Sequence, residues 1–164
     1  MTTRAMTGSC LVVGIGDPAR GDDGVGLAVA RAVADRALPG VYVCVHRDPT
    51  ALMDLWAGRD LVVVVDAVRS GAVPGTVHRL AVGVGETPLP FPAWAASGRG
   101  THAFGLAAVV ELARALGRLP EHLVVVGVEA ASFGCGYPLS TEVLAAVPVA
   151  AEQVVEEVRA HVRR

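Results

Sequence analysis

The hydrophobic positions of the chain form short runs that alternate with longer stretches of helical spacing. Four apolar runs predict β-strands at Cys10–Ile15, Val41–His46, Leu61–Val65 and Leu123–Val128. The five consecutive apolar residues of Leu61–Val65 are typical of a strand that is buried on both faces. Thr76–Val82 alternates between apolar and polar residues, which predicts an exposed or edge strand.

Apolar residues spaced three and four apart predict the helices that separate these strands. They fall at Asp23–Ala37, Thr50–Ala57 and Phe104–Leu116. Ser140 can cap a final helix, which we expect to break near Pro148 and to end at about Arg159. The segment Gly83–Gly100 is rich in Gly, Pro and Ser, and we expect it to be a mobile loop that orders against a partner.

The resulting order, βαβαββ-loop-αβα, predicts an α/β protein. Strands that alternate with helices form three-layer α/β/α domains with a mostly parallel sheet. No repeat or linker divides the sequence, so we expect a single domain over residues 1–164. In such a sheet the functional side chains lie in loops at the carboxyl ends of the strands. These loops are therefore where chemistry is expected.

Composition and charge narrow the functional classes. Of the 164 residues, 52% are hydrophobic and 18% are charged, which favours a packed core over disorder. The net charge of −2 and the lack of a basic stripe argue against nucleic-acid binding. No apolar run approaches the roughly 18 residues of a membrane-spanning helix. The three separated cysteines fit a reducing, cytoplasmic compartment rather than a disulfide framework.

Three carboxylates lie in the loop between the first strand and the first helix, namely Asp17, Asp22 and Asp23. Asp22 can be a helix N-cap, and Asp23 can be a first-turn acid that the helix dipole favours. Alternatively, Asp23 projects into a cleft, where it would bind a metal ion or polarise water. The sequence pattern leaves both interpretations open.

Two further residues occupy comparable positions. Asp66 directly follows the buried run Leu61–Val65, which places its carboxylate at the rim of the cleft unless it caps a turn. His102 follows the long loop and precedes a helix, where a single histidine is commonly a cap or a surface residue. Together, Asp23, Asp66 and His102 form a set that could bind a transition metal or carry out acid–base chemistry.

The glycines of the first loop also permit a nucleotide-binding interpretation. Residues Gly14–Ala19 match the loose GxGxxA form of the dinucleotide fingerprint of oxidoreductases. The carboxylates of the same loop would repel a pyrophosphate, which makes this interpretation the less favoured one.

Four segments in order resemble the motifs of the NiFe-hydrogenase maturation endopeptidases, which trim the C-terminal extension of the hydrogenase large subunit. They are VGIGDPARGDDGV at 13–25, LVVVVDAVRSG at 61–71 with the PGT that follows, TH at 101–102, and the block 125–148. The resemblance covers nearly the whole chain.

This resemblance implies a twisted, mostly parallel five-stranded sheet between helices, a fold of the phosphorylase/hydrolase-like kind. It implies that Asp23 and Asp66 are catalytic, and that Asp23, Asp66 and His102 contact a metal. The implied enzyme is an aspartic-type, nickel-dependent endopeptidase that acts on the large-subunit precursor after nickel insertion. The substrate would carry the nickel. No permanently bound metal, nucleic acid or membrane partner is expected, and we expect a monomer.

Some features depart from the family or admit other functions. The family often has Glu at the position of Asp23 and usually Asn at that of Asp17, whose extra charge bears on substrate preference. Cys135 has no assigned role. The same three ligands would also serve a non-enzymatic nickel carrier or a docking factor for hydrogenase assembly. The peptide bond could be attacked by water that Asp23 or Asp66 activates, or after polarisation by nickel.

Overall fold

The computed structural model describes residues 9–85 and 101–164, with the backbone alone for residues 101–104. Five strands form one sheet: β1 (Cys10–Ile15), β2 (Val41–His46), β3 (Leu61–Val68), β4 (Val77–Ala81) and β5 (His122–Glu129). Their order is β2-β1-β3-β5-β4, and only the pair of β4 and β5 is antiparallel. The expected loop at Gly83–Gly100 lies outside the described residues from 86 onward.

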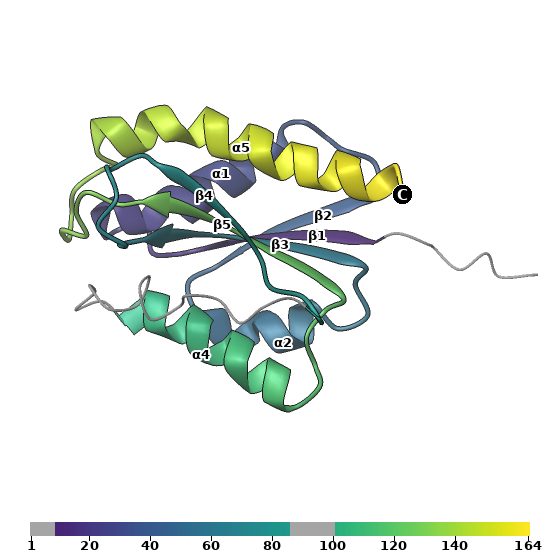
Figure 1. The fold of residues 1–164 in the computed structure, drawn as a ribbon. Helices are drawn as coiled ribbons and strands as arrows, with labels where there is room; N and C mark the ends of the chain where they lie inside the picture. Colours follow the sequence, from purple (N-terminus) through teal and green to yellow (C-terminus); the bar gives the residue numbers. More distant parts are fainter. Residues whose placement is uncertain (1–8, 86–100) are drawn as a thin grey trace, which may run out of the picture.

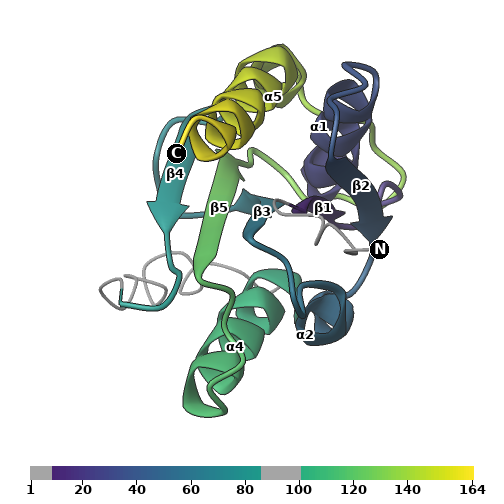
Figure 2. The same ribbon diagram turned by 90° about the vertical axis from the view of Figure 1, so that its right-hand side faces the viewer.

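Helices cover both faces of the sheet (Figures 1 and 2). One face carries α1 (Val25–Ala34) and α5 (Thr141–Val162), and the other carries α2 (Leu52–Leu55) and α4 (Thr101–Ala115). A hydrophobic core lies on each face of the sheet. Alternate residues of each strand pack into one core or the other, because successive side chains of a strand point to opposite faces. The three-layer α/β fold with a mostly parallel sheet is therefore confirmed.

Two element boundaries differ from the sequence prediction near the candidate site. Strand β3 does not end before Asp66 but continues to Val68, because its last residues still pair with β5, as in the pair Val68 and Glu129. Helix α4 begins at Thr101, so that His102 lies inside its first turn rather than before it. Both corrections move predicted site residues from loops into regular elements.

The break that we expected near Pro148 is absent, and α5 is a single helix. Proline deprives the carbonyl four residues earlier, that of Leu144, of its helical N–H partner. Both Pro148 and Leu144 lie on the exposed side of the helix, where water can replace the lost partner. The opposite side is held to the sheet by buried residues such as Ala150 and Val154, so the helix continues.

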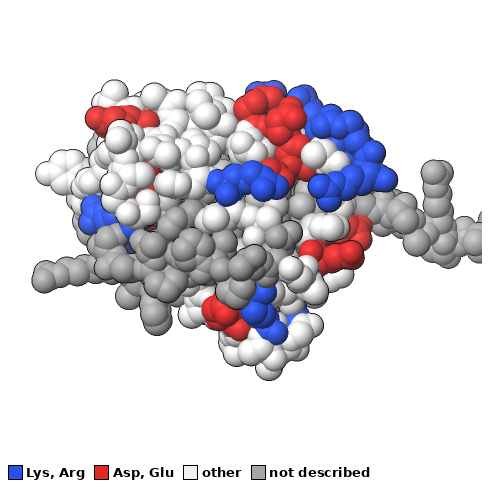
Figure 3. Space-filling model, in the orientation of Figure 1, with Lys and Arg blue, Asp and Glu red and all other residues white. Residues whose placement is uncertain are grey.

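The surface over α5 and the edge strand β4 carries charges of both signs side by side (Figure 3). Ion pairs join Arg36 to Glu152 at 2.9 Å and Arg159 to Glu156 at 3.4 Å. This face therefore has no field of a single sign. Within the described residues, none of the helices is both long enough and apolar enough to cross a membrane.

Glycines allow the backbone of α1 to lie directly on the sheet. A Cβ atom at Gly26 of α1 would lie 2.4 Å from the carbonyl oxygen of Ile15 and 2.5 Å from that of Val65. A Cβ at Gly14 of β1 would in turn lie 2.2 Å from the carbonyl oxygen of Gly26. No side chain fits between these elements, so the start of α1 is fixed close to the carboxyl ends of β1 and β3.

The substitution Gly26→Ala is expected to lower the free energy of unfolding by about 2 kcal/mol or more, because the new methyl group overpacks the contact with two strands. This loss outweighs the roughly 1 kcal/mol by which Ala favours a helix over Gly. Urea denaturation measures the change. Gly117→Ala is the control, since its Cβ would meet no atom within 4 Å and only its positive φ of 65° is strained. A loss at Gly26 no larger than at Gly117 would contradict the direct-contact argument.

Candidate active site

Asp66 is buried inside β3, and its side chain points toward the layer of α2 and α4. It shares strand alternation with Val64 and Val68, which pack against these helices. Only 1% of the residue is exposed, so it does not lie at an open rim as we expected. Its Oδ1 accepts a hydrogen bond of 2.8 Å from the N–H of Ala67. Among the described residues, Oδ2 has no hydrogen-bond partner.

Asp23 lies in a single 3₁₀ turn, η1 (Gly21–Gly24), that leads into α1. It is 4% exposed, and its Oδ2 accepts a hydrogen bond of 2.9 Å from the N–H of Asp17. A Cβ atom at Gly16 would lie 1.8 Å from the carbonyl oxygen of Asp23, so only glycine permits this turn to approach the end of β1. The glycine-mediated packing of α1 thus delivers Asp23 to the carboxyl edge of the sheet.

The two carboxylates interact electrostatically. Burial raises the pKa of Asp66 well above its usual range, and the negative charge of Asp23 raises it further. The hydrogen bond from Ala67 opposes this change because it stabilises the ionised form. The structure therefore brings two of the three predicted site residues together as a coupled pair of acids.

His102, the third predicted site residue, is the second residue of α4. Its side chain lies outside the described part of the structure. Its backbone places it in the first turn of the helix that covers the same sheet face as Asp66. Among the side chains that are described, no three His, Cys, Asp or Glu residues are arranged to hold a metal ion.

Asp22 is structural, but it is not the helix cap that its position suggested. The N-cap residues of η1 and α1 are Arg20 and Gly24, and the Asp22 carboxylate instead reaches the loop after β5. It accepts hydrogen bonds from the N–H groups of Ala131, Ser132 and Ser140 at 2.7–3.0 Å, and from the Ser140 hydroxyl at 2.9 Å. Asp22 therefore fixes the first loop to the segment that precedes α5.

Glu129, which the sequence analysis did not single out, closes the other side of the site. It is 1% exposed at the end of β5 and accepts hydrogen bonds from Ser70 N, Ser70 Oγ and Gly71 N at 2.8–3.1 Å. Its Oε2 also lies 3.1 Å from Nε2 of His78 on β4. Glu129 directly follows the predicted strand Leu123–Val128, as Asp66 follows Leu61–Val65, so the same rule could have found it.

Four acidic residues are buried in the described part of the chain, and all lie at this end of the sheet: Asp22, Asp23, Asp66 and Glu129. Their hydrogen bonds come from main-chain N–H groups, serine hydroxyls and His78. Of these donors only the imidazole can carry a positive charge. Such a concentration of buried negative charge attracts a cation and opposes a pyrophosphate, which does not support the nucleotide-binding interpretation.

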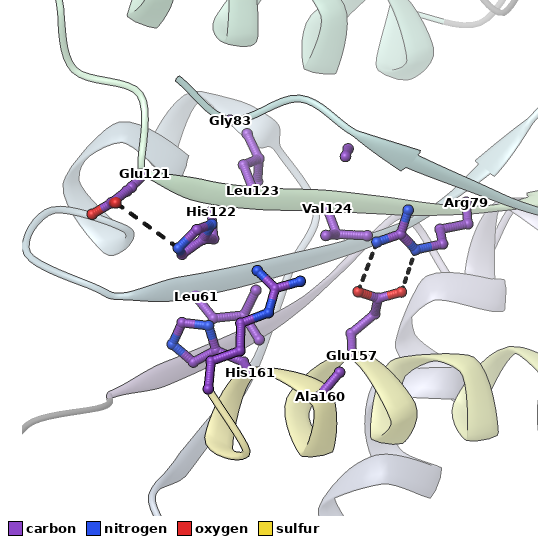
Figure 4. Close-up of a pocket in the computed structure, with 12 residues that line it drawn as sticks. Leu61, Arg79, Gly83, Glu121, His122, Leu123, Val124, Glu157, Ala160 and His161 are labelled. Carbon is purple, nitrogen blue, oxygen red and sulfur yellow. Dashed lines mark hydrogen bonds and ion pairs between the residues drawn. The ribbon is translucent and has the colours of Figure 1, made fainter. Parts of the chain in front are cut away.

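A separate cavity of about 90 Å³ lies at the opposite, amino edge of the sheet (Figure 4). Arg79 of β4 forms a bidentate ion pair with Glu157 of α5 in its wall. The rings of His122 and His161 meet edge to face, with their centroids 5.3 Å apart. These contacts join the ends of β4, β5 and α5, and they lie far along the strands from the pair of Asp23 and Asp66.

The chain is similar to hydrogenase maturation proteases in sequence and in fold. The family model described as hydrogenase maturation protease matches residues 47–157, which include Asp66 and His102. Hydrogenase 2 maturation protease of Escherichia coli (strain K12) is 31% identical over 153 residues, which are 91% of this chain and 90% of the relative.

Solved structures agree with these sequence matches. The hydrogenase maturating endopeptidase HybD from E. coli has a TM-score of 0.74 and 26% identity, with 93% of each chain covered. An endopeptidase from E. coli solved in solution has a TM-score of 0.80 and 29% identity, again over 93% of each chain. The NiFe-hydrogenase maturation protease HybD from Thermococcus kodakarensis shares the fold, with a TM-score of 0.70 at 24% identity over 91% of this chain and 98% of its own.

Asp66→Asn is expected to stabilise the folded chain at pH 7. Asn retains an oxygen for the Ala67 N–H but removes the buried charge beside Asp23. Because the pKa of Asp66 is raised, the folded chain binds this proton more tightly than the unfolded chain does. The increase in the free energy of unfolding of Asp66→Asn over the wild type is complete above the raised pKa of Asp66. It disappears as the pH falls below about 4, the ordinary pKa of aspartate. Urea denaturation across this pH range measures it.

Asp22→Asn is the matched control, and it should lower the free energy of unfolding instead of raising it. The amide of Asn carries N–H groups, which would face the main-chain N–H groups that now donate to the carboxylate. This lowers the free energy of unfolding by about 2 kcal/mol or more. Destabilisation by both substitutions would contradict the distinction between Asp66 and Asp22.

Proposed function

The chain belongs to the hydrogenase maturation protease family, and we propose that it removes the C-terminal extension from the large-subunit precursor of a NiFe hydrogenase at a site formed by Asp23, Asp66 and His102. As a member of this family it is a hydrolase of the endopeptidase class. The observation that carries the site assignment is the coupled, buried pair of Asp23 and Asp66. We propose that the reaction takes place in the cytoplasm, a proposal that the three free cysteines support because they suit a reducing compartment.

The donor atoms of the proposed site suit a divalent transition metal. Carboxylate oxygens from Asp23 and Asp66, together with an imidazole nitrogen from His102, form a mixed oxygen and nitrogen set. Each aspartate uses one oxygen to accept a main-chain N–H and keeps the other without a partner among the described residues. In the proposal these oxygens contact nickel that the substrate already holds. Substrate without nickel would then be bound poorly and left uncut.

The carboxylates also supply a base for peptide hydrolysis. The carboxylate of higher pKa takes a proton more readily, and burial and the charge of Asp23 raise the pKa of Asp66. We therefore propose that Asp66 takes a proton from the attacking water. Nickel of the substrate, when bound, supplies positive charge near the carbonyl that is attacked.

Asp23→Asn and Asp66→Asn are each expected to reduce precursor processing at least about 100-fold, because each removes a proposed metal ligand and Asp66→Asn also removes the base. The measurement is the shift of nickel-loaded large subunit to its shorter form on a denaturing gel. Asp17→Asn is the control, because Asn can still accept the Ala19 N–H that Asp17 accepts at 2.9 Å. Wild-type processing by either site variant would remove that residue from the proposed site.

Processing is expected to require nickel in the substrate rather than in the protease. Precursor prepared without nickel should be left intact by an amount of protease that trims the nickel-loaded precursor to completion. Pre-treatment of the protease with a chelator, followed by its removal, should leave the rate unchanged. Equal cleavage of metal-free and nickel-loaded precursor would refute this dependence. Binding of loaded precursor without any cleavage would instead indicate a docking factor.

A further inference from the structure

Strand β2 forms one edge of the sheet, beside α1 (Figure 2). Among the described residues it pairs with β1 alone. Its sequence, VYVCVH, holds no Lys, Arg, Asp, Glu or Pro. Charged side chains and proline are the residues that commonly protect an edge strand from pairing with another chain. The edge of β2 is therefore one that an extended peptide can join.

The hydrogen bonds between β2 and β1 show which main-chain groups of β2 point outward. The carbonyl of His46, at the end of β2, accepts a hydrogen bond from the N–H of Gly16. Main-chain groups of successive residues point to opposite sides of a strand, so those of Val45 and Val43 point away from β1. Because no further described strand lies beside β2, these N–H and C=O groups have no ladder partner within the described residues.

An apolar groove of about 240 Å³ lies next to these groups, between the end of α1 and β2. All of its lining residues are apolar, namely Val33, Ala34, Ala37, Leu38, Val41 and Val43. Every second side chain of a peptide paired with β2 would point to the face on which this groove lies. Main-chain hydrogen bonds to a strand edge, combined with pockets for alternate side chains, are how edge strands bind peptides.

The carboxyl end of β2 is connected to the candidate active site. Gly16, which donates to His46, precedes Asp17, whose N–H donates to the Asp23 carboxylate. In the proposed function the nickel of the folded large subunit contacts Asp23 and Asp66, so the chain before the cut stays with that subunit. The extension after the cut is then the part that can run along β2, from the carboxyl end of this strand to its amino end.

We propose that the C-terminal extension of the precursor binds to β2 as an added antiparallel strand and places an apolar side chain in the groove beside α1. This inference rests on the proposed function and specifies how its substrate is held. The added strand lies two strand spacings, about 10 Å, from β1, and Val43 lies another 10 Å or so before the end of β2. The groove is therefore about 20 Å from the cut, which places the apolar side chain about six residues after it.

A second copy of the chain is a less suitable occupant of this edge. Two strands of six residues that pair edge to edge bring few residues into contact. A stable interface between two proteins uses about 20–30 residues from each partner. The extension needs no comparable area of its own, because the active site and the large subunit to which it is joined supply the other contacts.

The first test uses the intact protease and a synthetic peptide of about 12 residues that copies the start of the extension. Hydrogen exchange of individual main-chain N–H groups is followed by NMR. The peptide in excess should slow exchange at Val43 and Val45 at least about 10-fold. Exchange at Tyr42 and Cys44, whose N–H groups already face β1, should change less than about 2-fold. This alternating pattern requires neither cleavage nor nickel.

The second test measures kcat and KM for nickel-loaded precursor. Val45→Pro removes an outward N–H, a change that an edge strand tolerates, and it should raise KM at least about 10-fold while kcat changes less than about 2-fold. Val45→Thr keeps the N–H and the branched shape and is the matched control. Ala34→Phe fills the groove from an exposed position on α1 and should also raise KM, whereas Ala34→Ser should not.

The outcomes separate this inference from the proposed function. Unchanged KM values for Val45→Pro and Ala34→Phe, or no added protection of Val43 and Val45 by the peptide, would overturn the assignment of β2 and leave the protease assignment intact. A wild-type dimer that Val45→Pro dissociates without a change in KM would do the same, because a second copy would then occupy the edge. Should Val45→Pro fail to fold, as judged by urea denaturation, Ala34→Phe and the exchange pattern decide the question.

Failure of the proposed function has a different signature. If the wild-type chain cleaved no nickel-loaded precursor, that function would be refuted, while the exchange pattern with the synthetic peptide would still decide whether β2 binds the extension.

Discussion

The direct contact between the backbone of α1 and the strands beneath it determines the position of Asp23 in the candidate active site. Gly14 and Gly26 leave no room for a side chain between β1 and α1, and Gly16 admits the carbonyl of Asp23 to the end of β1. Had α1 stood one side chain further from the sheet, Asp23 would lie in solvent, where water and salt screen its charge. The close packing instead keeps its charge effective at Asp66, whose pKa it raises.

This arrangement buries two negative charges, those of Asp23 and Asp66, for which the described residues provide no ion pair. An ionised carboxylate in an apolar environment lowers stability unless it is paired, and among the described residues Asp66 interacts electrostatically with the like charge of Asp23. The aliphatic cores on both sides of the sheet make the fold tolerate this cost. A local feature that lowers stability, within a fold that is otherwise consistent with its sequence, is characteristic of a functional site. The cation that relieves the repulsion arrives with the substrate in the proposed reaction.

Sequence patterns predicted the order of the elements, the sheet type and the bounds of β1 and β2, because short runs of apolar, largely β-branched residues are local signals. The sequence patterns did not predict features that depend on pairing with residues far away in the sequence. Asp66 was expected to end its strand, yet its pairing with Gly127 of β5 continues the ladder through the acid. The partners of Asp22 lie more than 100 residues away, so no local pattern could reveal them. The continuity of α5 through Pro148 depends on which side of the helix faces water.

The four buried acids fall into two classes, according to how completely their oxygens are bonded. The carboxylates of Asp22 and Glu129 each take part in four hydrogen bonds among the described residues, and these bonds join separate loops to the sheet. Among the described residues, the carboxylates of Asp23 and Asp66 each accept one. A carboxylate that is saturated by N–H groups has no lone pair left for a metal ion or a proton, whereas an unsaturated one is costly to hold in place. Asp22 and Glu129, whose oxygens are fully bonded, hold in place the backbone around the other two acids. Asp22 adjoins Asp23 in the same turn, and Glu129 fixes the segment that follows β3. The fully bonded and the incompletely bonded carboxylates are therefore neighbours at one end of the sheet, and sequence position alone does not distinguish them.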